Sequence, residues 1–196
     1  MCQMTFDGNR NEGEKSIYIR KANPTDADVT TVAWTVLTAL DIDTEDLGWI
    51  KQTCSDELSM YSWSKSIVAY VDDKPVGAIV SYPGDNYESL RKYTWPKLWG
   101  DKCKESIDTT EAEALPGEYY LDSLAILPEY RGCSIGKILI AAAIEQGKSL
   151  GYKKFTLLVE CTKPKLKAYY ESIGFAEIGE MTFFGHRYKR MMKHDD

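Results

Sequence analysis

Residues 121–137 read LDSLAILPEYRGCSIGK, and this stretch decides the fold of the chain. An apolar segment runs through a proline into a basic turn with Gly132 and Gly136, and a segment with apolar residues at helical spacing follows. This order predicts a strand, a loop and a helix. The first N–H groups of a helix lack carbonyl partners and carry partial positive charge, so they suit a phosphate. The glycines let a pyrophosphate approach the backbone, and Arg131 and Lys137 add positive charge.

Two motifs in this sequence resemble those of one family. The order Leu-Pro-x-x-Arg-Gly-x-x-Ile-Gly over residues 127–136 resembles the acetyl-CoA pyrophosphate loop of the GNAT superfamily of acyltransferases. In the usual loop, Arg or Gln is followed by two residues, Gly, one residue, and Gly or Ala. Ser134 stands at the first of the two fixed glycines, and its Cβ narrows the backbone angles that are available. Residues 169–175, YYESIGF, are similar to the Leu/Phe-Tyr-Glu-x-Leu-Gly-Phe ending of the same superfamily, with Tyr170 on the motif tyrosine.

The resemblance covers roughly residues 17–192 and implies a mixed α/β fold. We expect a central sheet of about six or seven strands, flanked by helices and splayed between its two central parallel strands. A helical, aromatic-rich insertion precedes the fourth strand. The implied reaction is transfer of an acetyl group from acetyl-CoA to a primary amine by direct attack in a ternary complex. The alternative is a catalytically weak CoA-binding sensor or interaction module on the same fold.

The resemblance also implies how acetyl-CoA is held. Where a strand stops pairing, its N–H and C=O groups can bond an extended arm that carries amides. The expected contacts to the pantetheine arm are the backbone groups of Leu124, Ala125 and Ile126, whose dipoles would also stabilise an oxyanion. The expected pyrophosphate contacts are Arg131, Gly132, Cys133, Ser134, Ile135, Gly136 and Lys137.

The implied chemistry needs an acid for the leaving sulfur and a base for the amine. Tyr170 is the expected acid, because a phenol with a pKa of ~10 keeps its proton at neutral pH. Asp122 is the candidate base, and Glu160, His186 and a water chain are the alternatives. His186 is also a candidate for binding the acceptor. Lys163 stands where the family often has an asparagine, so it could bind phosphate in that residue's place, or the contact could be lost.

Composition limits the class of protein. With 196 residues, of which 43% are hydrophobic and 28% charged, we expect one soluble domain over residues 16–196 after a flexible leader, residues 1–15. No apolar run of membrane-spanning length and no signal peptide is evident, so we expect a cytoplasmic protein without a membrane partner. The net charge of −6 argues against nucleic-acid binding and suits a cationic amine, either a small molecule or a peptide amine. A homodimer is compatible with the sequence.

Cysteine and histidine usage predicts no metal site. The five cysteines are scattered singly without Cys-x-x-Cys spacing, and the chain has two histidines. Cys133 lies inside the basic turn, where we expect only its backbone to matter and expect no redox or nucleophilic role for its small side chain.

The remaining elements follow from periodicity and turn residues. A first helix is expected to begin at Pro24, with Asn23 as its N-cap, and to end near Leu40. Asp26, at the third position, is expected to bond back to the cap residue. Further helices are expected over 45–58, 88–98, 104–113, 135–150 and 164–173, and strands over 17–20, 66–71, 76–82, 155–160, 175–181 and 187–192. Between Pro83 and Gly117, aromatic residues are interleaved with charge, and we expect them to pack within the domain rather than stack on nucleic acid.

Overall fold

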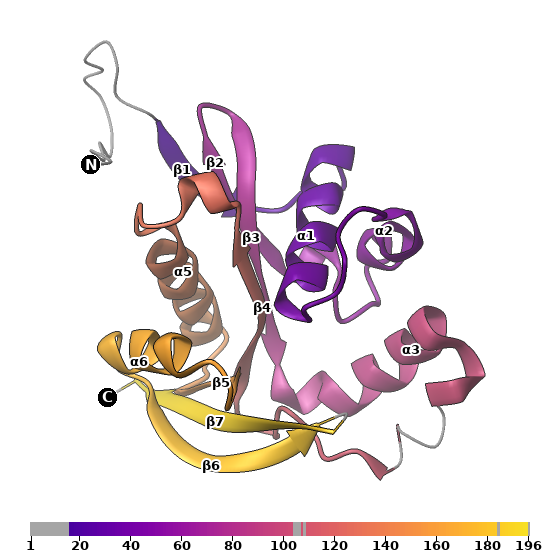
Figure 1. Ribbon diagram of the computed structural model, residues 1–196, viewed down its shortest axis with the longest axis vertical. Helices are drawn as coiled ribbons and strands as arrows, with labels where there is room; N and C mark the ends of the chain where they lie inside the picture. Colours follow the sequence, from indigo (N-terminus) through magenta and orange to yellow (C-terminus); the bar gives the residue numbers. More distant parts are fainter. Residues whose placement is uncertain (1–15, 104–106, 108, 184, 196) are drawn as a thin grey trace. The chain divides into compact units, whose positions relative to one another are not determined.

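The computed structural model describes residues 16–103, 107, 109–183 and 185–195 (Figure 1). The predicted leader, residues 1–15, lies outside the described residues. The elements in chain order are β1 (Ile17–Lys21), α1 (Asp26–Ala39), α2 (Gly48–Ser55), β2 (Ser66–Val71), β3 (Lys74–Pro83), α3 (Tyr87–Trp99), β4 (Tyr119–Ile126), α5 (Ile135–Ser149), β5 (Lys154–Glu160), α6 (Pro164–Ser172), β6 (Ala176–Phe183) and β7 (His186–His194).

The strands form one mixed sheet in the order β1-β2-β3-β4-β5-β7-β6. The β4–β5 pair is parallel, and the β1–β2, β2–β3, β5–β7 and β6–β7 pairs are antiparallel. The parallel register joins Tyr119 to Phe155 and Tyr120 to Thr156, and it does not continue to Leu121. The predicted fold class, a mixed sheet of six or seven strands flanked by helices, is confirmed.

Two compact units make up the described chain, and β3, β4 and α5 each contribute residues to both. The first unit contains residues up to Val80 together with Ser123–Ala143. Its centre is β2, all of whose residues are buried between β1 and β3. Asp72 and Asp73 join β2 to β3 with φ of 50° and 62°, the left-handed pair that a two-residue hairpin turn requires. The strands predicted over 66–71 and 76–82 are observed as β2 and β3, which this turn joins as an antiparallel pair.

Helix α1 begins two residues later than the sequence predicted. Thr25 is its cap, and the Thr25 side chain accepts a hydrogen bond from the Asp28 N–H at 3.3 Å. The prediction of an Asn23 cap was wrong because the Asn23 N–H donates to the Asp28 carboxylate at 2.7 Å, which holds this segment outside the helix. Asp28 also accepts from Arg20 at 2.6 Å, so the start of α1 is tied to β1.

Helix α2 is shorter than the predicted 45–58. Aspartate side chains on both sides of it bond nearby backbone N–H groups instead of leaving them to a helix. Asp46 accepts from the Gly48 N–H at 2.8 Å, and Asp56 accepts from the Leu58 N–H at 3.0 Å. These local bonds confine the helix to Gly48–Ser55.

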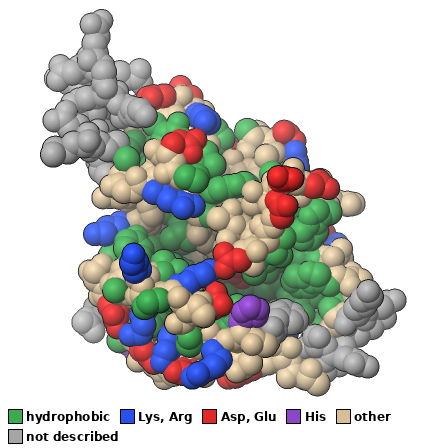
Figure 2. All heavy atoms as spheres, in the orientation of Figure 1, with side chains coloured by type: hydrophobic (Ala, Val, Ile, Leu, Met, Phe, Trp, Pro, Cys, Tyr) green, Lys and Arg blue, Asp and Glu red, His purple; other side chains and the backbone are tan. Residues whose placement is uncertain are grey.

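The second unit contains residues 81–122 and 144–196 as far as they are described. In it, β7 pairs with β5 on one side and with β6 on the other (Figure 1). Basic and acidic side chains are interspersed over β6 and β7 (Figure 2), where Lys189 bonds Glu177 at 2.8 Å and also pairs with Glu180. Gly147 of α5 lies so close to β4 and β5 that a Cβ would come 2.7 Å from both the Tyr119 and Phe155 rings.

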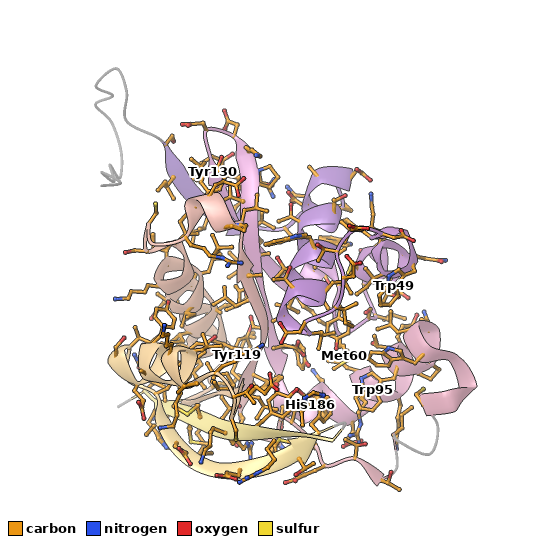
Figure 3. All side chains as sticks on the ribbon, in the orientation of Figure 1. Trp49, Met60, Trp95, Tyr119, Tyr130 and His186 are labelled. Atoms are coloured by element: carbon orange, nitrogen blue, oxygen red, sulfur yellow. The ribbon has the colours of Figure 1, made fainter. Side chains whose placement is uncertain are left out.

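The insertion between β3 and β4 contains the predicted first helix, observed as α3. Tyr87 and Trp95 are buried, and the Trp95 ring meets the Phe183 ring edge-on at 5.8 Å (Figure 3), as expected for residues that pack within the domain. The predicted second helix, 104–113, falls partly on residues that are not described, and its end is wrong, because residues 111–113 are not helical. Pro116 follows closely and disfavours helix before it.

Candidate active site

The basic turn between β4 and α5 is tied to the neighbouring strands. The Leu127 N–H donates to the Val76 carbonyl of β3 at 2.9 Å, and the Arg131 Nε donates to the Ile126 carbonyl of β4 at 2.9 Å. A short 3-10 turn, Pro128–Tyr130, lies between these two anchors, with Tyr130 labelled in Figure 3. The turn therefore has a fixed position relative to the end of β4.

The turn contains two residues in left-handed conformation just before the first N–H groups of α5. Gly132 and Ser134 both have left-handed φ, 80° and 62°, and α5 begins at the next residue, Ile135. The Ile138 N–H donates to the Ser134 carbonyl at 3.2 Å. The N–H groups of residues 135–137 come before this bond and so have no carbonyl partner within α5. Such alternating conformations with free N–H groups form an anion-binding concavity.

Ser134 occupies the position where the family has a fixed glycine, and the structure explains that glycine. A residue with a Cβ pays about 1–2 kcal/mol in the left-handed region. Ser134 is exposed and accepts this conformation, whereas Ile135 beside it is buried and anchors the start of α5. Serine at this position therefore still adopts the left-handed conformation.

The end of β4 alternates between buried and partly exposed residues. Ser123 and Ala125 are buried, and Leu124 and Ile126 are half-buried. Gly77 of β3 lies directly against this segment: a Cβ on Gly77 would come 2.4 Å from the Ala125 carbonyl oxygen. The glycine thus permits a close approach of β3 to the segment that the sequence predicted to hold the pantetheine arm.

Tyr170 lies on α6 in an aromatic environment. Its side chain is buried, and its ring centroid is 5.4 Å from that of Tyr169 and 5.8 Å from that of Phe175. Burial, and then Tyr169, raise the pKa of Tyr170 above its ordinary value. The phenol therefore keeps its proton at neutral pH, which a general acid requires.

Asp122 belongs to a polar cluster inside the second unit. The Tyr82 hydroxyl donates to the half-buried Asp122 carboxylate. Nearby, Glu113 accepts from the Tyr87 hydroxyl at Oε1 and from the Tyr120 hydroxyl at Oε2, each at 2.8 Å. We define these five residues as the tyrosine–carboxylate cluster.

Sequence reasoning found Asp122 in this cluster and missed Glu113, Tyr82, Tyr87 and Tyr120. Glu113 was the last residue of the predicted helix 104–113, and no role was predicted for it. The signal available in the sequence is Pro116, which disfavours helix in the residue before it and so argues against a helix that continues toward β4.

Glu160, Lys163 and His186 meet at the carboxyl end of β5. Glu160 lies 3.2 Å from His186 Nδ1 and 3.5 Å from Lys163 Nζ. The hydrogen bond with His186 is the main cause that lowers the pKa of Glu160, and Lys163 lowers it further. His186, labelled in Figure 3, begins β7 and has a side chain that is 62% exposed. Lys163 thus pairs with a carboxylate.

The described part of the chain has neither a grouped set of metal ligands nor a helix that could span a membrane. Among its residues, no three His, Cys, Asp or Glu side chains are grouped so that they could hold a metal ion. None of its helices has the length and apolar character needed to cross a bilayer.

The model of the acetyltransferase (GNAT) family matches residues 36–175. No curated protein matches the sequence.

Among solved structures, the chain is similar to a crystal structure of an acetyltransferase, with 24% identity, a TM-score of 0.71 and coverage of 91% of this chain and 100% of that one. An N-acetyltransferase from Staphylococcus aureus Mu50 also has 24% identity and a TM-score of 0.71, with coverage of 89% and 99%. The PaiA N-acetyltransferase from Thermoplasma acidophilum, solved in complex with coenzyme A, has 18% identity, a TM-score of 0.56 and coverage of 92% and 99%. At these identities the likeness establishes the fold.

Proposed function

The chain belongs to the acetyltransferase (GNAT) family, and we propose that it transfers an acetyl group from acetyl-CoA directly to the primary amine of a bound acceptor. The observation that carries the proposal is the left-handed backbone at Gly132 and Ser134, just before the first N–H groups of α5. The same turn also bears Arg131 and Lys137. These donors fit a pyrophosphate.

The residues present fit the rest of acetyl-CoA as well. The parallel register of β4 on β5 ends at Tyr120, so β4 continues toward Leu124, Ala125 and Ile126 with backbone groups suited to the amides of the pantetheine arm. In this proposal the loop holds the pyrophosphate, the end of β4 orients the arm, and the thioester carbonyl faces backbone N–H groups that stabilise its developing negative charge.

The proposed reaction consists of proton transfers, formation of the carbon–nitrogen bond and cleavage of the carbon–sulfur bond. The ammonium group of the acceptor loses a proton to Asp122. The amine nitrogen then forms a bond to the thioester carbonyl carbon, whose oxygen becomes an oxyanion. When the oxyanion collapses, the carbon–sulfur bond breaks, and Tyr170 gives its proton to the sulfur. As the amide forms, its nitrogen loses its second proton to solvent. Solvent restores the proton of Tyr170, and Asp122 releases the one it took.

The contacts favour Asp122 over the other candidate bases. The lowered pKa of Glu160 makes it a weak proton acceptor at neutral pH. The exposed His186 is bonded to Glu160, which suits it to contact an acceptor. Asp122 lies on β4 just before the segment proposed to hold the pantetheine arm.

A second candidate function, a CoA-binding module with little turnover, is favoured by one observation. Lys163 stands where the family often has an asparagine, and it pairs with Glu160, so it is engaged away from a phosphate. Such a module would bind CoA through the turn before α5 but would transfer little or no acetyl group.

The test is mass spectrometry of a panel of small-molecule amines and peptide amines incubated with the protein and acetyl-CoA, with calorimetry of CoA binding alongside. The proposal predicts that CoA binds and that at least one amine gains an acetyl group. CoA binding without an acetylated amine would favour the module, and absence of CoA binding would refute both functions. Intact-protein mass in acetyl-CoA alone should stay unmodified, because an acetylated protein that passes its group to the amine would contradict direct attack.

A further inference from the structure

The tyrosine–carboxylate cluster is more elaborate than one base requires. Both oxygens of Glu113 accept tyrosine hydroxyls, and a third hydroxyl, from Tyr82, bonds Asp122. The Tyr82 and Tyr120 ring centroids are 5.9 Å apart, and those of Tyr87 and Tyr120 are 6.5 Å apart, both edge-on. All three tyrosines are buried. The packing therefore fixes where each hydroxyl points.

Two carboxyl groups in such surroundings oppose each other's ionisation. Burying a carboxylate is unfavourable unless it is paired, and two neighbouring carboxylates resist carrying two charges. Among the described residues, Arg91 of α3 is a cation whose charge acts on Glu113, and its guanidinium bonds the Glu88 carboxylate and the Thr110 carbonyl, each at 2.9 Å. The tyrosines hold their protons and act as donors, because burial raises the pKa of Tyr82 and Tyr120. Asp122 and Glu113 are therefore the groups of the cluster that exchange a proton.

We infer that Glu113 is a positioning residue for proton removal: it shares one proton with Asp122, and its negative charge makes Asp122 a strong enough base to take a proton from the acceptor's ammonium group. The inference rests on the proposed function for its catalytic meaning. Glu113 acts through Asp122 and through the tyrosine hydroxyls that hold it. The shared proton itself is a property of the resting protein.

The electrostatics agree with the geometry. Burial, and then the charge of Asp122, raise the pKa of Glu113 to about 7, although the Tyr120 and Tyr87 hydrogen bonds and Arg91 act in the opposite direction. Below that pH the pair holds one proton, and above it both carboxylates are ionised. The fully ionised pair is the proton acceptor, so activity should rise as the pH passes upward through the neutral range.

Glu113→Gln is the variant that removes the charge and keeps the shape. An amide can still bond both tyrosine hydroxyls, so the packing is retained. Without the second charge, the acidic limb of the kcat/KM profile should move to lower pH by about one unit or more, and kcat at neutral pH should fall about tenfold. Glu111→Gln, an exposed carboxylate two residues away, is the matched control and should leave the profile unchanged.

A direct readout does not depend on turnover. Carbon-13 NMR of protein labelled at the glutamate side-chain carboxyl should show one resonance, absent in Glu113→Gln, that titrates near neutral pH. In Asp122→Asn the same resonance should titrate at lower pH, because the opposing charge is gone. A Glu113 resonance that titrates in the ordinary acidic range, or that ignores Asp122→Asn, would overturn the inference.

These readouts separate the inference from the proposed function. If no amine is acetylated while the Glu113 resonance behaves as described, the proposed function fails and the shared proton stands. If amines are acetylated and the Glu113→Gln profile matches that of wild type, the function stands and the role of Glu113 is refuted.

Discussion

Substitution of Gly77 by alanine tests whether β3 lies in close contact with residues 124–126 of β4, the proposed contacts of the pantetheine arm. The added Cβ would lie 2.4 Å from the Ala125 carbonyl oxygen and 3.0 Å from the Ile126 Cα. An ordinary carbon–oxygen contact is about 3.3 Å, so one strand must move by about 1 Å. Both obstacles are backbone atoms, which cannot swing away as a flexible side chain would.

The structure sets the size of the effect. Overpacking a close-packed site destabilises by typically about 1–3 kcal/mol, and the rigid neighbours place Gly77→Ala near the upper end, at about 3 kcal/mol. For a chain of this length, that corresponds to a fall in Tm of about 6–12 °C. Because Ala125 and Ile126 are candidate contacts of the pantetheine arm, a displacement of about 1 Å should also weaken CoA binding by about tenfold or more.

Differential scanning calorimetry measures the first effect and isothermal titration with CoA measures the second. Gly179→Ala in β6 is the matched control, since no atom lies within 4 Å of its added Cβ, and its stability should stay within about 0.5 kcal/mol of wild type. A Gly77→Ala protein as stable as Gly179→Ala would refute the close approach. A destabilised Gly77→Ala protein with unchanged CoA affinity would instead remove Ala125 and Ile126 from the cofactor site.

Two further predictions concern the basic turn between β4 and α5 and the start of α1. Ser134→Gly should relieve the left-handed strain at φ 62°, raise stability by about 0.5–1 kcal/mol in urea denaturation and tighten CoA binding; a less stable variant would contradict it. Asp28→Asn should lose about 2 kcal/mol at neutral pH. Burial alone would raise the pKa of Asp28, but hydrogen bonds from Arg20, Tyr70 and the Asn23 N–H outweigh it and hold that pKa below 3.8. The wild-type advantage should therefore be complete above pH 3.8 and shrink as the pH falls through the lowered pKa, and a pH-independent difference in urea titrations would refute the assignment.

Local sequence patterns predicted the parts of the fold that depend on local chemistry. The β2–β3 hairpin follows from two adjacent aspartates that tolerate left-handed backbone between β-rich runs. The turn before α5 follows from a proline, a basic residue and glycine placed between a strand and a helix. Both are decided by residues close together in the chain, so the sequence was sufficient.

Tertiary contacts decided what the sequence could not. The cap of α1 is Thr25 and not the predicted Asn23, and Arg20 of β1 is hydrogen-bonded to the Asp28 carboxylate in the first turn of the helix. Glu113 was predicted to end the helix 104–113, whereas hydroxyls from α3 and β4 hold its carboxylate in the cluster. Periodicity within one segment carries no information about such partners on other elements, which is why the neighbours of Asp122 were missed.

The kinetics of Tyr170→Phe test the central claim, that this chain transfers an acetyl group with Tyr170 as the acid, most directly. The substitution keeps the buried ring, with its contacts to Tyr169 and Phe175, and removes only the hydroxyl. Turnover and CoA affinity would be measured on the same preparation. The account predicts a fall in kcat of about 10²-fold or more, with CoA affinity unchanged. A kcat close to that of wild type, or an equal loss of CoA affinity, would contradict it.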